Sequence, residues 1–272
     1  SAADIARLRR MTLAGMMDCK KALEEAEGNF EKAVEIIRKK GQSVANKRAD
    51  REASEGVVLA RVSDDGKRGI MIVLNSESDF VAKNAEFVGF ANQILDLAMK
   101  SNPADLEELK SLPMDGVTVG EKVVEYIGII GEKLELSAYY RIEAPFVQAY
   151  IHPGNKLAAL TGFDRAGLDQ QVYKDVVMQV AAMNPVAVDK GDVPQSVIDQ
   201  ELEIGREQAR REGKPEAMLE KIAQGKLAKF YKESTLLNQD FIKDSKITVG
   251  QYLKTAGDSL KVTGFERHSL TI

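Results

Sequence analysis

The sequence has few of the residues that build metal sites and covalent cross-links. It contains one cysteine, Cys19, so no disulfide can form within the chain, which is typical of a reducing compartment. Its two histidines, His152 and His268, lie far apart in the sequence and no second thiol accompanies them. Because a zinc site needs three or four such ligands grouped together, we expect no metal and no cofactor.

Long apolar runs and an excess of positive charge are also missing. No segment approaches the roughly 18 apolar residues that a membrane-spanning helix needs, and the amino terminus lacks the apolar core of a signal peptide. The formal net charge of −4 does not favour binding to a phosphate backbone. We therefore expect a cytoplasmic protein that binds neither membranes nor nucleic acid directly. With 272 residues, the chain is long enough for two or three folded units.

Residues 1–53 predict a module of three short helices and a polar linker. Apolar residues recur at helical spacing in Asp4–Arg10, Met16–Ala26 and Phe30–Lys40. Asn29 is a good N-cap, and Gly41 predicts the end of the third helix. Helices this short are not stable alone, so the three should pack together, with Cys19 partly buried. Residues 42–55 predict a helical or extended linker.

Residues 54–142 and 143–272 predict two related α+β subdomains. In both, the order is strand, turn, strand, helix, so each subdomain should be a sheet with helices packed on it. The expected strands are Gly56–Val62, Gly69–Leu74, Leu134–Ile142, Phe146–Tyr150, Leu157–Phe163 and Leu260–Leu270. The expected helices are Ala85–Met99, Glu121–Ile130, Asp169–Met183 and Thr248–Lys254.

A charged segment at about residues 190–233 interrupts the second subdomain. Pro194 opens its first helix, and Arg211–Pro215 separates this helix from a second one. Both helices have narrow apolar stripes, which predicts an antiparallel helical hairpin that projects from the domain. Such a hairpin could bind a partner or allow self-association. The alternative, packing of both helices on the core, is disfavoured by their high charge.

The connection Ser76–Asn84, between a strand and a helix, contains an unusual pair of neighbours. Phe80 is an aromatic residue in a polar turn, and Asp79 precedes it. Surface connections of this kind often carry functional groups. Two other interpretations remain open, because Asp79 could cap the following helix and Phe80 could fold back as a hydrophobic staple.

Several stretches resemble the bacterial elongation factor Ts family, the guanine nucleotide exchange factors for elongation factor Tu. The sequence TLAGMMDCKKAL at residues 12–23 is similar to the amino-terminal motif of the family, with Leu13 where the family usually has glycine. Residues 78–81 are similar to its Thr-Asp-Phe-Val segment, and Ser78 keeps the hydroxyl. The Thr-Val-Gly-Gln and Val-Thr-Gly-Phe segments at 248–251 and 262–265 are similar too. Some members carry a further helical module after this strand, whereas this sequence stops at Ile272.

The resemblance implies a factor without covalent chemistry. It would bind the GTPase domain of elongation factor Tu, in the GDP-bound and nucleotide-free forms, disturb the magnesium and phosphate site, and so allow GDP to leave and GTP to rebind. Phe80, flanked by Ser78, Asp79 and Val81, would enter that domain near the magnesium. The remaining contacts implied by the resemblance are Arg9, Met16 and Met17 on the same domain, and His152, Pro153 and Gly154 on a second one.

Two other functions deserve comparison. Ser78, Asp79 and Lys83 could imitate a nucleophile with partners, but no histidine is near enough in sequence to act as a base, and the chain has no phosphate-binding Gly-x-x-x-x-Gly-Lys-Ser/Thr loop. The three-helix module also resembles ubiquitin-associated domains, with Gly15, Met16 and Met17 in their binding loop. That second function would leave residues 56–272 unexplained.

Overall fold

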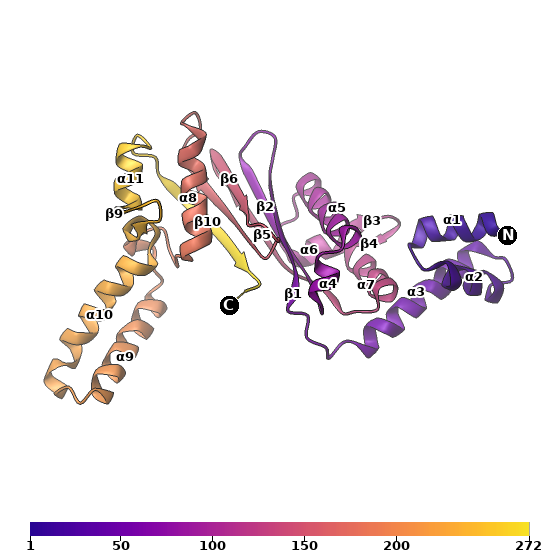
Figure 1. Cartoon of the computed structure of the whole chain (residues 1–272), viewed down its shortest axis with the longest axis horizontal. Helices are drawn as coiled ribbons and strands as arrows, with labels where there is room; N and C mark the ends of the chain where they lie inside the picture. Colours follow the sequence, from indigo (N-terminus) through magenta and orange to yellow (C-terminus); the bar gives the residue numbers. More distant parts are fainter. Residues whose placement is uncertain (272) are drawn as a thin grey trace.

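A computed structural model of the chain describes residues 1–271 and shows a mixed α+β protein, as the sequence predicts. The helices are α1 (Ala2–Thr12), α2 (Met16–Glu25), α3 (Phe30–Lys47), α4 (Asp79–Ala82), α5 (Ala85–Ser101), α6 (Leu106–Ser111), α7 (Val119–Ile130), α8 (Gln170–Met183), α9 (Gln195–Arg211), α10 (Leu219–Ser234) and α11 (Val249–Thr255). The strands are β1 (Glu55–Val62), β2 (Arg68–Ser76), β3 (Pro113–Met114), β4 (Val117–Thr118), β5 (Leu134–Glu143), β6 (Phe146–Ile151), β7 (Leu157–Phe163), β8 (Asp240–Phe241), β9 (Asp244–Thr248) and β10 (Val262–Ser269). The molecule is elongated, with α1 and α2 at one end and the pair α9 and α10 at the other (Figure 1).

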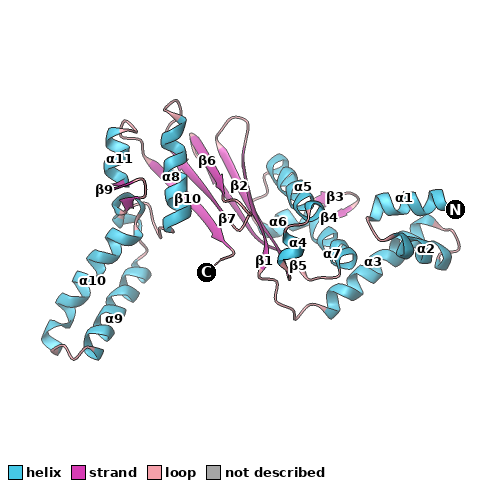
Figure 2. Cartoon of the chain, in the orientation of Figure 1, coloured by secondary structure: helices cyan, strands magenta, loops and turns pink. Residues whose placement is uncertain are grey.

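Two antiparallel sheets form the centre of the molecule. Their strand orders are β1-β2-β5 and β10-β7-β6, so β2 and β7 are the central strands. The sheets pack face to face, while α5 and α7 cover the outer face of the first and α8 and α11 that of the second. Figure 2 shows the strands between two groups of helices. None of the helices within residues 1–271 is long and apolar enough to cross a membrane.

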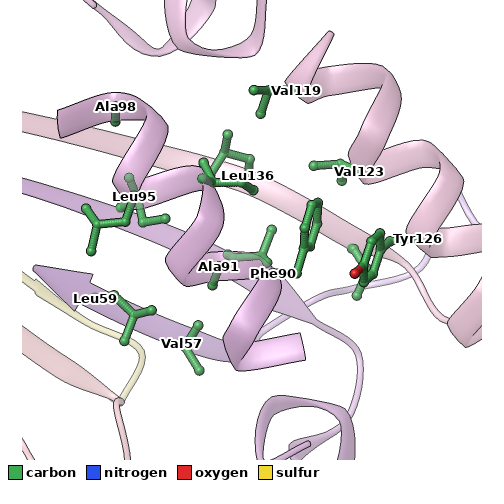
Figure 3. Close-up of a cluster of buried hydrophobic side chains, with 14 of the residues drawn as sticks. Val57, Leu59, Phe90, Ala91, Leu95, Ala98, Val119, Val123, Tyr126 and Leu136 are labelled. Carbon is green, nitrogen blue, oxygen red and sulfur yellow. The ribbon is translucent and has the colours of Figure 1, made fainter. Parts of the chain in front are cut away.

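The central strand β2 is buried on both faces, which explains its continuous apolar run. Ile70 and Ile72 face α5 and α7, whereas Met71 and Val73 face the second sheet. A strand alternates its side chains between two faces, so burial of both faces requires apolar residues at every position. On the helical side, Phe90 of α5 and Tyr126 of α7 stack with ring centroids 3.8 Å apart, above the strands (Figure 3).

The same chain path builds both sheets. In each, a hairpin is followed by a helix on the outer face, a second helix and a third strand that pairs with the central one. Local signals accompany both copies: Asn102 and Asn184 end α5 and α8 in the left-handed conformation, each before a proline. Thr118 and Thr248 form capping boxes that start α7 and α11. The sequence analysis did not predict the short ribbons β3-β4 and β8-β9.

The amino-terminal helices pack around a small core of their own. Leu8, Cys19, Ala22 and Ala33 are buried in it, and Cys19 is fully buried where partial burial was expected. The prediction that Gly41 ends the third helix is wrong, because α3 continues to Lys47. Gly41 lies inside the helix and faces α7, where its backbone takes up the space that a Cβ on Gly128 would need.

Helices α9 and α10 run side by side away from the sheets (Figure 1). Small residues allow close contact, since a Cβ on Gly205 would lie 3.0 Å from the Cα of Ala223. The ion pair of Arg206 with Glu220 (2.9 Å) and that of Arg210 with Glu216 (3.4 Å) join the two helices. Many of the charges that make this segment so polar are therefore paired within it.

Candidate functional site

The strand β2 leads directly into α4, the one-turn helix that carries Phe80. Ser78 is the N-cap of this helix, and its hydroxyl accepts a hydrogen bond from the backbone N–H of Val81 (3.3 Å). Phe80 is 84% exposed, so it does not fold back as a staple, and Ser78 rather than Asp79 caps the helix. Ala82 turns inward on the opposite side and is buried. The helix thus points an aromatic ring into solvent.

Asp79 forms an ion pair with Lys83 one turn later, at 2.7 Å. The Lys83 ammonium, by its hydrogen bond and its charge, holds the pKa of the Asp79 carboxyl below its usual range. The pair is exposed and spans one turn of helix, so its contribution to folding stability is small. Both charges remain accessible to a partner beside the Phe80 ring.

A cleft of about 860 Å³ lies between the amino-terminal helices and the first sheet's helices. Arg9 and Met16 line it on one side, and Val81 lines it on the other. Its floor is mostly apolar and comes from α5 and α7, with Phe87, Phe90, Tyr126, Ile129 and Ile130. The structure therefore brings Arg9, Met16 and Val81 to one surface, although 65 residues separate Met16 from Val81 in the sequence.

The loop between α1 and α2 holds the two methionines outside the small core. Met16 and Met17 are 59% and 62% exposed, so neither fills that core. Leu13 has φ +55°, the left-handed conformation that glycine adopts without strain. The loop therefore keeps a backbone conformation that favours glycine, although a leucine occupies this position. Exposed methionines are adaptable apolar contact groups.

The turn His152-Pro153-Gly154 joins β6 to β7 and is exposed. The carbonyl of the next residue, Asn155, accepts a hydrogen bond from the backbone N–H of Val58 (2.7 Å), near the start of β1. Glu55, which begins β1, pairs with Ser76 at the end of β2. The turn and α4 consequently lie at the same end of the two sheets.

Sequence reasoning missed the residues that hold the base of α4. Glu132 accepts hydrogen bonds from the N–H and hydroxyl of Ser78, at 3.0 and 2.7 Å. Arg48, which lies in the predicted linker of residues 42–55, donates two hydrogen bonds to Glu77, at 3.0 and 3.2 Å. The only sequence signal is the polar Gly-Glu-Lys after a predicted helix, and it does not reveal a contact 54 residues away.

Within residues 1–271, no group of three or more His, Cys, Asp or Glu side chains is placed to hold a metal ion. The surface instead combines an exposed aromatic ring, exposed methionines and an apolar cleft with charged edges. Exposed apolar groups gathered in this way are typical of surfaces that bind another macromolecule. Fold and surface together define a partner-binding protein built on a double α+β scaffold.

Comparison with known proteins identifies the family. The model of the family described as elongation factor TS matches residues 77–271. The chain is 55% identical over 268 residues to elongation factor Ts of Porphyromonas gingivalis, a comparison that covers 98% of this chain and 97% of that protein. It is 54% identical to that of Amoebophilus asiaticus (98% and 97% covered) and 50% identical to that of Christiangramia forsetii (99% and 98% covered). This chain belongs to the elongation factor Ts family.

Membership in this family makes the chain a translation elongation factor of the guanine nucleotide exchange class. The similarity covers 98% of the chain, so it includes nearly all of the part that a ubiquitin-binding function leaves unexplained.

Proposed function

We propose that this chain releases GDP from elongation factor Tu by binding its GTPase domain and disturbing the magnesium and phosphate site, after which GTP rebinds. The observation that supports this most is the 84% exposure of Phe80 on α4. A phenyl ring that is mostly exposed in the free chain gains binding free energy when a partner buries it.

The factor contributes binding energy rather than chemistry. Exchange requires that factor and nucleotide weaken each other's binding, and by thermodynamic linkage the two effects are equal. Phe80 enters the GTPase domain near the magnesium in this proposal. Asp79 competes locally with the ligands on the phosphate side, Ser78 holds the turn, and Val81 contacts the partner where the cleft begins.

The remaining contacts lie on either side of α4. Arg9, Met16 and Met17 grip the same GTPase domain, which the exposure of both methionines supports. His152, Pro153 and Gly154 contact a second domain of the partner, which their place at the same end of the sheets supports. A partner large enough to span these groups is needed, and a multidomain GTPase meets that requirement.

We further propose the following modular division. Residues 1–53 form a ubiquitin-associated-like module with its linker, residues 54–142 the first core subdomain, and residues 143–272 the second. The separate small core of α1–α3 and the repeated chain path of the sheets support it. The projecting hairpin of α9 and α10 is the part through which copies of the chain could associate.

The test is release of a fluorescent GDP from elongation factor Tu, followed by stopped flow with and without this chain. Phe80→Ala should leave thermal unfolding nearly unchanged and slow the exchange by roughly 10- to 150-fold, the range expected for a binding hot spot. Phe230→Ala is a control, because Phe230 lies on α10 far along the chain from the proposed contacts. Normal exchange by Phe80→Ala would contradict the role of Phe80, and no acceleration by the unmodified chain would contradict the function.

A further inference from the structure

The helix α4 is too short to keep its own orientation. It has four residues, about one turn, and an isolated turn is unstable in water because nucleation costs more than one hydrogen bond returns. Burial contributes only in part, since Ala82 is the one buried residue of α4, Val81 packs partly buried against the first core, and Phe80 faces solvent. Contacts at the two ends of the helix must therefore supply much of what fixes the direction of Phe80.

At its carboxyl end, α4 is connected directly to α5. The side chain of Asn84 accepts a hydrogen bond from the backbone N–H of Glu86 (2.8 Å) and starts the new helix. This contact fixes the turn after α4, and α5 is rigid because Phe87 and Phe90 are buried in the core. It does not hold the opposite end, where Ser78 begins α4.

At the amino end, the two neighbouring segments hold each other, because each has a glutamate that accepts hydrogen bonds from the other segment. Glu132 accepts both hydrogen bonds that Ser78 can donate, at 3.0 Å from the N–H and 2.7 Å from the hydroxyl. In return, Glu77 accepts a hydrogen bond from the backbone N–H of Lys133, at 2.7 Å. Hydrogen bonds to ionised carboxylates are among the strongest in proteins.

A third segment completes this arrangement. Arg48, just after α3, donates to both carboxylate oxygens of Glu77. The Lys133 ammonium donates to the carbonyls of Ala49 and Arg51, at 2.8 and 2.9 Å. The hydrogen bond from Lys133 N–H, followed by the Arg48 charge and hydrogen bond, holds the pKa of Glu77 below its usual range, so this carboxyl is ionised at neutral pH. The linker after the amino-terminal helices is thereby tied to the base of α4.

We propose that Arg48, Glu77, Ser78, Glu132 and Lys133 form a polar clamp whose task is to hold α4, and with it Phe80, in the direction that enters the partner. Glu132 and Glu77 are positioning residues for nucleotide exchange: they act through Ser78 and α4. This inference rests on the proposed function. The clamp is fixed to the scaffold because Leu134, next to Lys133, begins β5, and β5 pairs along the whole of β2.

The physical gain is preorganisation. If α4 samples several directions in the free chain, only the fraction with Phe80 correctly placed can drive exchange, and the observed rate falls to that fraction of its full value. The clamp also ties α4 to the linker that follows α3, so Met16 and Met17 of the first loop keep a fixed position relative to Phe80. Removal of Glu132 should loosen α4 and leave the partner contacts of α1 and α2 intact.

The first test measures the clamp without any partner. In Glu132→Ala, amide hydrogen exchange of Ala82 and Lys83 should be at least about tenfold faster than in the unmodified chain, with no change at Ile72 and Val73 of β2. Glu132→Gln keeps the size and one acceptor oxygen, and should show a smaller increase. Glu135→Ala, an exposed glutamate on β5, is the matched control and should show none. Unchanged exchange at Ala82 and Lys83 in Glu132→Ala would overturn the clamp.

The second test measures its role in nucleotide release. Glu132→Ala should lower the maximal rate of GDP release about 5- to 10-fold and change the half-saturating concentration by less than about 3-fold. In a Phe80→Ala background, the same substitution should have almost no further effect, because the clamp acts through Phe80. An equal fold loss in both backgrounds would overturn the positioning role. If the unmodified chain does not accelerate release, the proposed function fails, while the hydrogen-exchange test still decides whether the clamp holds α4.

Discussion

Gly41 of α3 and Gly128 of α7 lie directly against each other. A Cβ on Gly128 would fall 2.5 Å from the Cα of Gly41, closer than packed atoms can approach. The contact is reinforced by Arg38, which donates to Glu125 one turn earlier on α7, at 2.8 Å. Two helices can cross this closely only because Gly128 has no side chain at the point where the backbone of Gly41 passes it. The pair sets where the amino-terminal helices sit relative to the sheets.

Gly128→Ala should therefore separate α3 from α7. We expect a loss of about 1–3 kcal/mol in the free energy of unfolding, the usual cost of overpacking, and a weaker affinity for the partner because the cleft widens. Thermal unfolding and the half-saturating concentration in the exchange assay measure the two effects. Gly225→Ala on α10 is the control: nothing lies within 4 Å of its added methyl group, so it should be neutral or stabilising. Equal behaviour of the two variants would contradict this account of the crossing.

Leu13→Gly should stabilise the amino-terminal helices. A leucine at φ +55° is strained by about 1–2 kcal/mol. Glycine relieves this strain, but the greater conformational entropy of glycine in the unfolded chain offsets part of the gain. Leu13 is 46% exposed, so the packing lost is limited. We expect slower hydrogen exchange in α1 and α2. Leu13→Ala removes the same side chain but keeps the strain, and should not stabilise; if it stabilises equally, strain is not the cause.

Removal of residues 1–53 should leave the two sheets folded. The amino-terminal helices have a core of their own, so the buried residues of the other clusters stay together and the first cluster loses only the packing of Val44 and Ala45 against it. Exchange by the shortened chain should weaken mainly through a higher half-saturating concentration. A smaller fall in maximal rate should accompany it, because the deletion removes Arg48 and with it the hydrogen bonds that Arg48 donates to Glu77. Undiminished exchange at low concentration would exclude Met16 and Met17 as contacts.

Glu77 should make stability depend on pH. Its pKa is below the ordinary 4.5, chiefly through the N–H of Lys133, so Glu77 stabilises the folded chain fully above that value and progressively less as the pH falls below it. Glu77→Gln should accordingly lower the free energy of unfolding at neutral pH. At about pH 3.5, the free energies of unfolding of the variant and the unmodified chain should lie closer together. Denaturant titrations at both pH values measure this. Glu135→Gln is the control, and a difference for Glu77→Gln that stays constant would contradict the prediction.

A magnesium chelator should reduce the acceleration of GDP release by this chain. Magnesium bridges nucleotide phosphates to a GTPase and neutralises their charge, so a chelator should already do part of what Phe80 does. The fold-acceleration by this chain should shrink in chelator without vanishing, and should shrink less for Phe80→Ala. GDP release by both proteins, with magnesium and with chelator, tests this. Equal acceleration by the unmodified chain in both conditions would exclude magnesium as a major part of the mechanism.

Much of the fold follows from local pattern. The apolar run that becomes β2, the helical spacing of α5 and the cap at Asn29 each report on residues a few positions apart, and each was predicted. Gly41 shows the limit of this reasoning. A glycine after a basic turn is a common helix end, and only Gly128, 87 residues later, explains why it lies inside a helix instead.

The sequence by itself identified residues proposed for the candidate site, because Met16 and Met17 stand in a long motif, and Asp79 and Phe80 in a short one, that could be compared with a family. Tertiary structure alone decided that Phe80 faces solvent, that Met16 and Val81 line one cleft, and that Glu132 holds Ser78. The physical reason is the distance along the chain over which each kind of interaction acts. Propensity, periodicity and capping act within a few residues, whereas the direction of a one-turn helix depends on hydrogen bonds to segments that only the packed sheets bring beside it.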